Sequence, residues 1–232
     1  MEPARPTTRR RRRALGVAAA AALAGAPALA SAAPVIATDA VCLRPSQEPG
    51  GTLVSPPLNI SGSGFSPNGP VSISRGGRQE TAFADATGAF AVQLSVLDLL
   101  RDRVPRSRPL DIVAADPGLG SSNPLRIRTA ALAFSATPKQ TRPSNTVTFK
   151  FSGFEPDRAV YAHYRYGGRM RANVTMGRAS NPCGLLTARR DQIPVRDPDV
   201  GLWQVQFDHR KTFSARATPR ITATVNVFQT AR

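Results

Sequence analysis

One nine-residue pattern occurs twice in this chain. Ser-Gly-Phe-x-Pro-x-x-x-Val spans residues 63–71 and again 152–160, so its copies begin 89 residues apart. A Gly-Gly-Arg triplet follows each copy, at 76–78 and 167–169. A fixed period of this size indicates a duplicated structural unit. Since about 100 residues make one two-sheet β-sandwich, we expect an all-β chain with two tandem sandwiches.

Short alternating runs between turns support this fold class. Residues 52–61 alternate around two prolines, which predicts an edge strand, because there proline removes no ladder bond. The sequence Asp-Ala-Thr-Gly at 85–88 lies between two apolar runs and predicts a hairpin. Two glycines at 167–168 readily supply the positive φ values of a type I′ hairpin turn after the alternating strand 159–166. Trp203, on another alternating run, is the expected core anchor of the second unit.

The N-terminus has the order of a signal peptide. A basic run at 9–13 precedes a weakly apolar stretch at 14–30, and Ala30-Ser31-Ala32 forms a small-x-small cleavage site. We expect residues 1–32 to be removed on export and the mature protein to be secreted or held in the cell envelope. The Sec and twin-arginine routes both stay open. No second apolar stretch of membrane length follows, so no transmembrane segment is predicted.

The repeat and the signal peptide together predict a domain plan. Residues 33–51 would be a weakly patterned lead-in with one short strand, residues 52–129 the first domain, and residues 130–232 the second. Residues 97–104 would add one helical turn.

The repeated motif has a structural explanation. In each copy a strand ends, a phenylalanine closes the bottom of the core, and a proline starts the turn to the next strand. These residues are Phe65 and Pro67 in the first unit and Phe154 and Pro156 in the second. The motif, followed by a short strand and a glycine turn, resembles the opening strands of bacterial immunoglobulin-like repeats of the IPT/TIG type. That resemblance implies spacer, adhesion or binding domains, and it implies no catalytic residue.

The chain has two cysteines, Cys42 and Cys183. In an exported protein a disulfide is the expected use of such a pair. It would close a loop of 141 residues, which the chain-entropy model values at about 4 to 5 kcal/mol. Unpaired thiols or an intermolecular bond remain alternatives. A further alternative is a transpeptidase or hydrolase in which His163 activates Cys183 and Arg189 or Arg190 stabilises the oxyanion. Sortase and L,D-transpeptidase motifs are absent, so we predict no enzyme.

Positive charge is concentrated in the second unit. Residues 33–129 contain nine arginines and eight acidic residues, whereas residues 130–232 contain sixteen basic and six acidic residues, a net of +10. This asymmetry favours an acidic partner outside the membrane, such as an anionic wall polymer, polysaccharide or acidic lipid. A merely soluble basic face, in a chain whose basic residues are mostly arginine, is the alternative. No nucleic-acid-binding motif is present.

The strongest binding candidate is the segment 161–171, which mixes aromatic and basic side chains. Folded as a hairpin, it would expose Tyr161, His163 and Arg165 on one face, with Arg169 and Arg171 across the turn. Aromatic rings beside guanidinium groups suit sugars and phosphates. An ordinary strand with solvated arginines is the alternative. Two histidines cannot form a three-histidine metal site, and no cofactor motif is present, so we expect neither metal nor cofactor.

Overall fold

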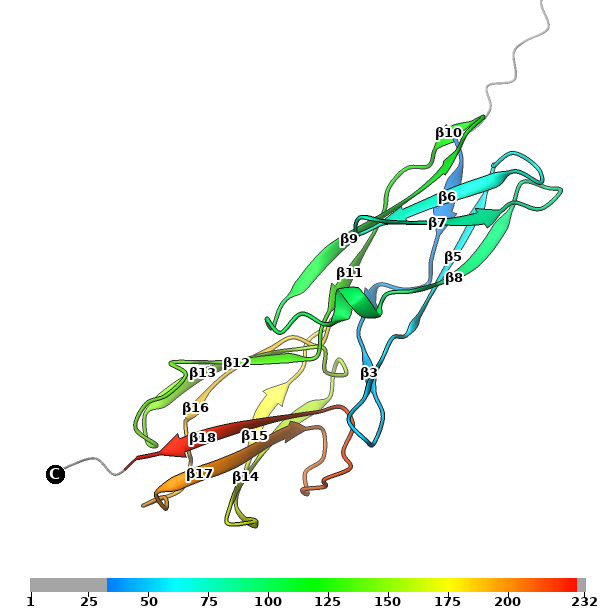
Figure 1. Cartoon of the computed structure of the whole chain (residues 1–232). Coiled ribbons are helices and arrows are strands. Elements are labelled where there is room, and N and C mark those ends of the chain that lie inside the picture. Colours follow the sequence, from blue (N-terminus) through cyan, green and yellow to red (C-terminus); the bar gives the residue numbers. More distant parts are fainter. Residues whose placement is uncertain (1–32, 229–232) are drawn as a thin grey trace, which may run out of the picture. The chain divides into compact units, whose positions relative to one another are not determined.

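The structure is a computed structural model that describes residues 33–228 (Figure 1). The signal peptide predicted at 1–32 lies outside the described residues. Apart from one 3-10 turn, η1 (Leu97–Leu100), the regular elements of the described chain are strands. No helix in that part of the chain is long and apolar enough to span a membrane.

Four sheets form two sandwiches, and each sandwich has its own hydrophobic core. In the first sandwich, one sheet has the order β1 (Val35–Ala37), β5 (Pro57–Ser63) and β8 (Phe90–Ser95). The facing sheet has the order β2 (Cys42–Leu43), β11 (Leu125–Ala130), β9 (Ser107–Asp116), β6 (Pro70–Arg75) and β7 (Arg78–Phe83), with β10 (Gly120–Ser121) paired to β9.

The second sandwich repeats this arrangement. One sheet has the order β12 (Ala133–Thr137), β13 (Thr146–Ser152) and β16 (Leu186–Asp191). The other has the order β15 (Arg169–Arg178), β14 (Ala159–Tyr166), β17 (Gly201–Asp208) and β18 (Arg220–Val227). Trp203 and Tyr164 are completely buried in its core, as expected for Trp203.

The chain is all-β, with two tandem immunoglobulin-like sandwiches. When the short strands β2, β3, β4 and β10 are left aside, each unit has seven strands. In both units the first, second and fifth form one sheet, and the third, fourth, sixth and seventh form the other. Immunoglobulin-like sandwiches divide their seven strands in this way, except that in the constant type the fourth strand lies in the sheet of the first, second and fifth. The β14–β15 hairpin has positive φ at both Gly167 (53°) and Gly168 (77°), which is the predicted type I′ turn, and Gly76 and Gly77 repeat it in the first sandwich.

Both copies of the repeated motif occupy the same position. Phe65 follows β5 and Phe154 follows β13, and each ring is buried in its own core. The preceding glycines, Gly64 and Gly153, have φ near 80°. Only glycine adopts this conformation without strain, so the Ser-Gly-Phe sequence fixes the same chain reversal in each unit.

The structure corrects two local predictions. Residues 85–88 do form a turn, but it is not a hairpin, since β7 and β8 belong to opposite sheets. The strand predicted at 52–61 begins at Pro57 and is central, between β1 and β8. Its proline is tolerated because it is the first strand residue. Local sequence specifies a turn or a strand, whereas pairing partners come from distant parts of the chain.

The segment predicted as a lead-in, 33–51, contributes to the sheets. Its strand β1 pairs with β5, and β2 pairs in parallel with β11. A short hairpin of β3 (Ser46–Gln47) and β4 (Leu53–Val54) follows. The segment is therefore part of the first sandwich, since it supplies the edge strand of one sheet and closes the edge of the other. The predicted boundary at residue 130 stays a prediction.

Candidate binding surface on the second sandwich

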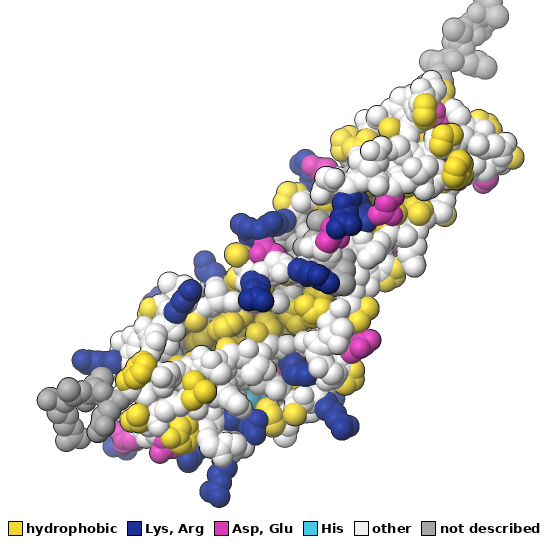
Figure 2. Space-filling view, viewed as in Figure 1, with side chains coloured by type: hydrophobic (Ala, Val, Ile, Leu, Met, Phe, Trp, Pro, Cys, Tyr) yellow, Lys and Arg dark blue, Asp and Glu magenta, His cyan; other side chains and the backbone are white. Residues whose placement is uncertain are grey.

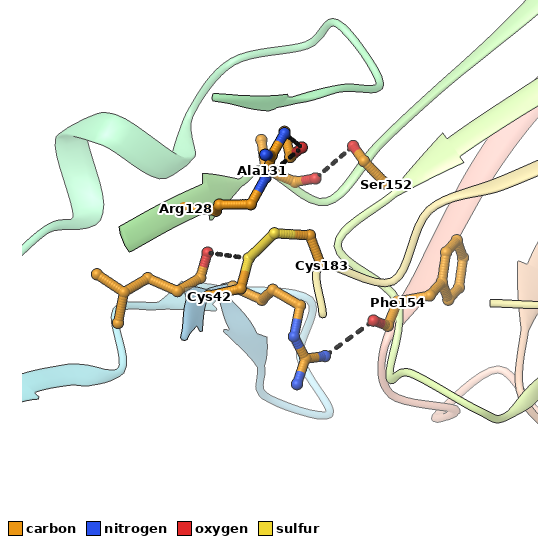
Figure 3. The surroundings of a disulfide bond; sticks show 9 residues. Cys42, Arg128, Ala131, Ser152, Phe154 and Cys183 are labelled. Carbon is orange, nitrogen blue, oxygen red and sulfur yellow. Dashed lines mark hydrogen bonds between the residues drawn. A yellow bond between two sulfur atoms is a disulfide. The ribbon is translucent and has the colours of Figure 1, made fainter. Parts of the chain in front are cut away.

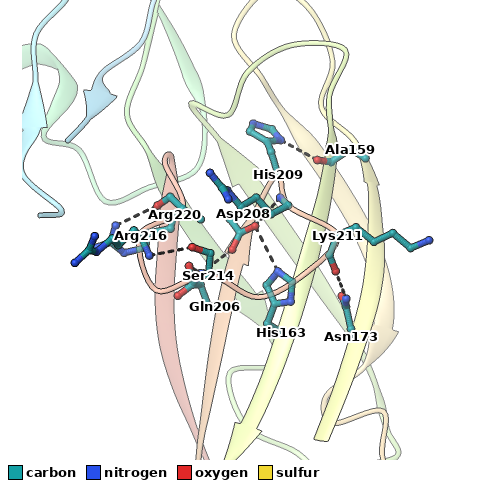
Figure 4. A network of polar contacts seen from close by, with 12 residues as sticks. Ala159, His163, Asn173, Gln206, Asp208, His209, Lys211, Ser214, Arg216 and Arg220 are labelled. Carbon is teal, nitrogen blue, oxygen red and sulfur yellow. Dashed lines mark hydrogen bonds and ion pairs between the residues drawn. The ribbon is translucent and has the colours of Figure 1, made fainter. Parts of the chain in front are cut away.

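The segment 209–219, between β17 and β18, covers the outer face of the sheet that contains the predicted site (Figure 4). The Asn173 side chain bonds the carbonyl of Lys211, and Gln206 Nε2 donates to Ser214 O at 2.8 Å. The ring of Phe213 lies edge-on to that of His163, with 5.8 Å between centroids. Strand alternation alone would leave this face in water, but the loop buries its centre.

Three polar side chains form a network under this loop. His163 and Asp208 are completely buried, with His163 Nε2 at 3.4 Å from Asp208 Oδ1. Gln206 Nε2 donates to Asp208 Oδ2 at 2.7 Å, and the backbone N–H of Arg210 donates to Asp208 Oδ1 at 2.6 Å. The carboxylate of Asp208 thus holds both a strand and the start of the loop. Buried polar groups with such partners stabilise a specific arrangement.

The burial of His163 corrects the prediction that it is exposed for ligand binding. The remaining predicted residues lie near the surface, but two are engaged within the protein. Arg165 lies over the ring of Phe213, 4.5 Å from its centroid, and donates to Gly168 O. Arg171 pairs with Asp199 at 2.9 Å. Arg169 is exposed at the hairpin and Tyr161 is half-buried. The structure therefore does not present the five predicted residues as one open site.

The two sandwiches differ in how their cations are paired. Five of the nine arginines in residues 33–129 form ion pairs with carboxylates: Arg75, Arg78, Arg106, Arg108 and Arg126. Among the fifteen basic residues described within 130–228, three do: Arg158, Arg171 and Arg196. Exposed basic side chains with no carboxylate partner in this described range include Lys139, Arg142, Lys150, Arg169, Arg189, Arg210, Lys211 and Arg216.

This difference in pairing was not predicted. The sequence indicated only where the charges lie along the chain. Arg189 and Lys150 are on the sheet of β12, β13 and β16, whereas Arg169 and Arg210 are on the opposite side of the sandwich. The unpaired cations therefore surround the second sandwich and are not confined to the β14–β15 hairpin.

A second histidine, His209, links the loop to the repeated motif. Its Nδ1 lies 2.8 Å from the carbonyl oxygen of Ala159, and its Nε2 accepts the backbone N–H of Glu155 at 3.0 Å. One nitrogen donates and the other accepts, so the contacts require the neutral ring. Burial lowers the pKa of His209 and favours that form, although the bond to Ala159 opposes the shift.

The disulfide between Cys42 and Cys183 is confirmed (Figure 3). Its Cα atoms are 5.5 Å apart, and it joins β2 to the segment between β15 and β16. Arg44 Nη1 donates to Phe154 O at 2.8 Å beside it, and the Ser152 hydroxyl donates to Ala131 O at 2.7 Å. Cys183 has no thiol in this state, so the Cys183-dependent enzyme lacks its nucleophile. Among the described residues, no three His, Cys, Asp or Glu side chains are grouped to hold a metal ion.

Comparison with known proteins does not identify a family. No protein-family model and no curated protein matches the chain. Solved structures resemble this chain at low identity, and three of them illustrate the likeness. The D00-D0 domain of intimin is 13% identical, with 84% of this chain and 100% of that chain covered and a TM-score of 0.32.

The other two likenesses are comparable. The human OSCAR ligand-binding domain is 11% identical, with 85% and 98% covered and a TM-score of 0.30. A Ca2+-stabilized adhesin that helps an Antarctic bacterium bind ice is 13% identical, with a TM-score of 0.28; 87% of this chain and 51% of that chain are covered. The chain therefore spans about half the length of this adhesin. At these TM-scores the likenesses establish neither fold nor function, and the immunoglobulin-like arrangement follows from the strand order.

Proposed function

We propose that this chain is an exported, non-catalytic surface-binding protein whose basic second sandwich contacts an anionic polymer of the cell envelope. The observation that carries this proposal is the set of exposed cations on residues 130–228 that have no carboxylate partner there. An unpaired surface guanidinium is free to bind a phosphate or carboxylate. In the first sandwich, most arginines already have an acidic partner.

Export and domain type are part of the same proposal. A signal peptide over residues 1–32 would deliver the chain to an oxidising compartment, where a disulfide such as Cys42–Cys183 persists. The repeated motif and the two immunoglobulin-like sandwiches fit bacterial repeats of the IPT/TIG type. Domains bounded near residue 130 would then be an adhesion or scaffolding pair, with the second domain as the binding part.

A spacer with no specific ligand is the main competing function. The proposed function and the spacer differ in whether the mature chain binds an anionic polymer. Residues 33–232 would be incubated with beads that carry poly(glycerol phosphate), with beads that carry neutral dextran, and with vesicles of phosphatidylcholine containing or lacking phosphatidylglycerol.

We expect retention on poly(glycerol phosphate) and none on dextran, because the interaction depends on fixed negative charge. Retention by the acidic vesicles alone would assign the ligand to lipid headgroups. Equal recovery from all four supports would contradict the proposal and favour the spacer.

A further inference from the structure

An apolar groove opens along one side of the second sandwich, between the edge strands β12 and β18. Its volume is about 400 Å³. Its floor is formed by core side chains of the two sheets, and its walls by Phe134 and Ala136 on β12 and by Ala223 and Val225 on β18. Floor residues are Phe149, Val205 and Phe207. Figure 2 shows this groove as an apolar band between these two strands, with basic side chains beside it.

The first sandwich shows how such an opening is closed. There the chain leaves the edge strand β1 and returns as β2, which pairs in parallel with β11, the last strand of the other sheet. In the second sandwich the equivalent strands are β12 and β18. Within the described chain, no strand pairs with the outer edge of β18. The segment after β12 reaches it through one side chain, since Gln140 Nε2 donates to Asn226 O at 3.3 Å.

We infer that this groove takes an extended peptide of a partner protein, which pairs with β18 and inserts alternate apolar side chains between β12 and β18. An unpaired strand edge supplies a row of backbone donors and acceptors, and pockets beside it select alternate side chains. The position of β2 in the first sandwich shows that this geometry accepts a parallel strand.

The charge around the groove indicates what the peptide carries. Arg103 and Lys139 line it, both are exposed, and no Asp or Glu among the described residues does so. Neither cation has a carboxylate partner within residues 33–228. A peptide with acidic residues flanking its apolar part would therefore be attracted. A second copy of this chain is disfavoured as the occupant, because two units of net +10 would meet edge to edge.

The test uses the mature chain and a synthetic peptide probe. The peptide alternates valine and threonine between terminal aspartates. One control has two central residues replaced by proline, which cannot donate to a strand ladder, and another has terminal lysines. Fluorescence polarisation would measure affinity, and hydrogen exchange would report protection of the β18 amides. We expect binding of the first peptide only, with slower exchange in β18.

Two pairs of variants locate the site. Ala223→Lys would put a charge into the groove, whereas Thr222→Lys adds the same charge to the exposed face of the same strand. We expect the first to weaken binding at least about tenfold and the second to leave it unchanged. Lys139→Glu should weaken binding of the aspartate peptide and strengthen that of the lysine peptide, whereas Lys150→Glu, on β13 and outside the groove lining, should do neither.

Several outcomes would overturn the inference. These are no binding, equal binding of the proline peptide, or equal losses in both members of a pair. Sedimentation showing that the free protein is a dimer which Ala223→Lys dissociates would assign the groove to a second copy instead. If Ala223→Lys fails to fold, the Lys139 and Lys150 pair decides.

Discussion

Each phenylalanine of the repeated motif packs against a glycine that arrives from a later turn. A Cβ atom added at Gly184 would lie 1.7 Å from the carbonyl oxygen of Phe154, and one added at Gly88 would lie 2.2 Å from that of Phe65. Both glycines also have positive φ. The motif therefore depends on a distant glycine in each unit, which its own nine residues do not reveal.

Gly184→Ala should destabilise the second sandwich far more than the matched change Gly168→Ala in the same domain. The added methyl group collides with backbone, which cannot move aside, so we expect a loss of about 3 kcal/mol or more in unfolding free energy. Gly168→Ala has a similar positive φ, but nothing lies within 4 Å of its new Cβ, and it should cost about 1 kcal/mol. Urea denaturation would measure both. Equal losses would show that φ alone matters.

His209 should make stability depend on pH. Its pKa is lowered in the folded state, so its neutral form contributes stability that is fully present above the unfolded value of about 6.5 and is lost as pH falls through the folded pKa. His209→Gln removes this titration. Its unfolding free energy should therefore fall less than that of the wild type between about pH 6.5 and pH 5. Parallel curves for the two proteins in urea titrations would contradict the assignment.

Asp85 and Asp116 make stability depend on pH in a separate, lower pH range. Hydrogen bonds from Thr87 lower the pKa of Asp85, and the backbone N–H of Ser66 lowers that of Asp116. Both contributions are present above about pH 3.9 and disappear only as pH falls below that value, so the window for His209 is free of them.

At the scale of elements, the β17–β18 loop covers one face of its sheet and buries a network of polar side chains there. Asp208→Ala would remove the acceptor of His163 and of the Arg210 amide, and would leave Gln206 Nε2 with Ser214 O alone. We expect a loss of about 2 to 4 kcal/mol, because buried donors are left unsatisfied. Asp199→Ala breaks only an exposed ion pair with Arg171 and should cost less than about 1 kcal/mol. Thermal melts would compare them, and similar melting temperatures would sink the network interpretation.

The elements also show what the sequence can and cannot predict. The repeat, the glycine hairpin and Trp203 follow from local patterns, and the structure has all three. The exposure of His163 was wrongly predicted, because the residues that cover it come from the loop around Phe213, about fifty positions later. The groove beside β18 was not predicted at all, since an unpaired edge depends on which strands are neighbours in the whole sandwich.

At the scale of the whole molecule, the disulfide ties the first sandwich to the second. Besides the bond from Arg44 to Phe154, Arg220 joins the same parts: its backbone N donates to Gln47 Oε1 at 2.7 Å, and its Nη1 donates to Pro49 O at 3.0 Å. The disulfide closes a loop of 141 residues. It therefore restricts the unfolded chain over nearly all of the first sandwich.

Removing the disulfide should lower stability without abolishing either core. Cys42→Ser with Cys183→Ser should cost up to about 4 to 5 kcal/mol by the chain-entropy model. The two hydrophobic cores do not share residues, so the sheets should persist, and far-ultraviolet circular dichroism should be unchanged. If the denaturation midpoint of the wild type were the same under reducing and oxidising conditions, the bond would add nothing to stability.

The central claim is that unpaired cations on the second sandwich bind an anionic polymer. Calorimetric titration of poly(glycerol phosphate) would compare the wild-type mature chain with two triple variants that lose equal charge. One is Arg169→Gln, Arg189→Gln and Arg210→Gln, and the other is Arg78→Gln, Arg108→Gln and Arg126→Gln, whose arginines are ion-paired. We predict that the first variant loses most of the affinity and its salt dependence, whereas the second keeps both. Equal losses from the two variants would mean that only bulk charge matters, and would contradict the claim.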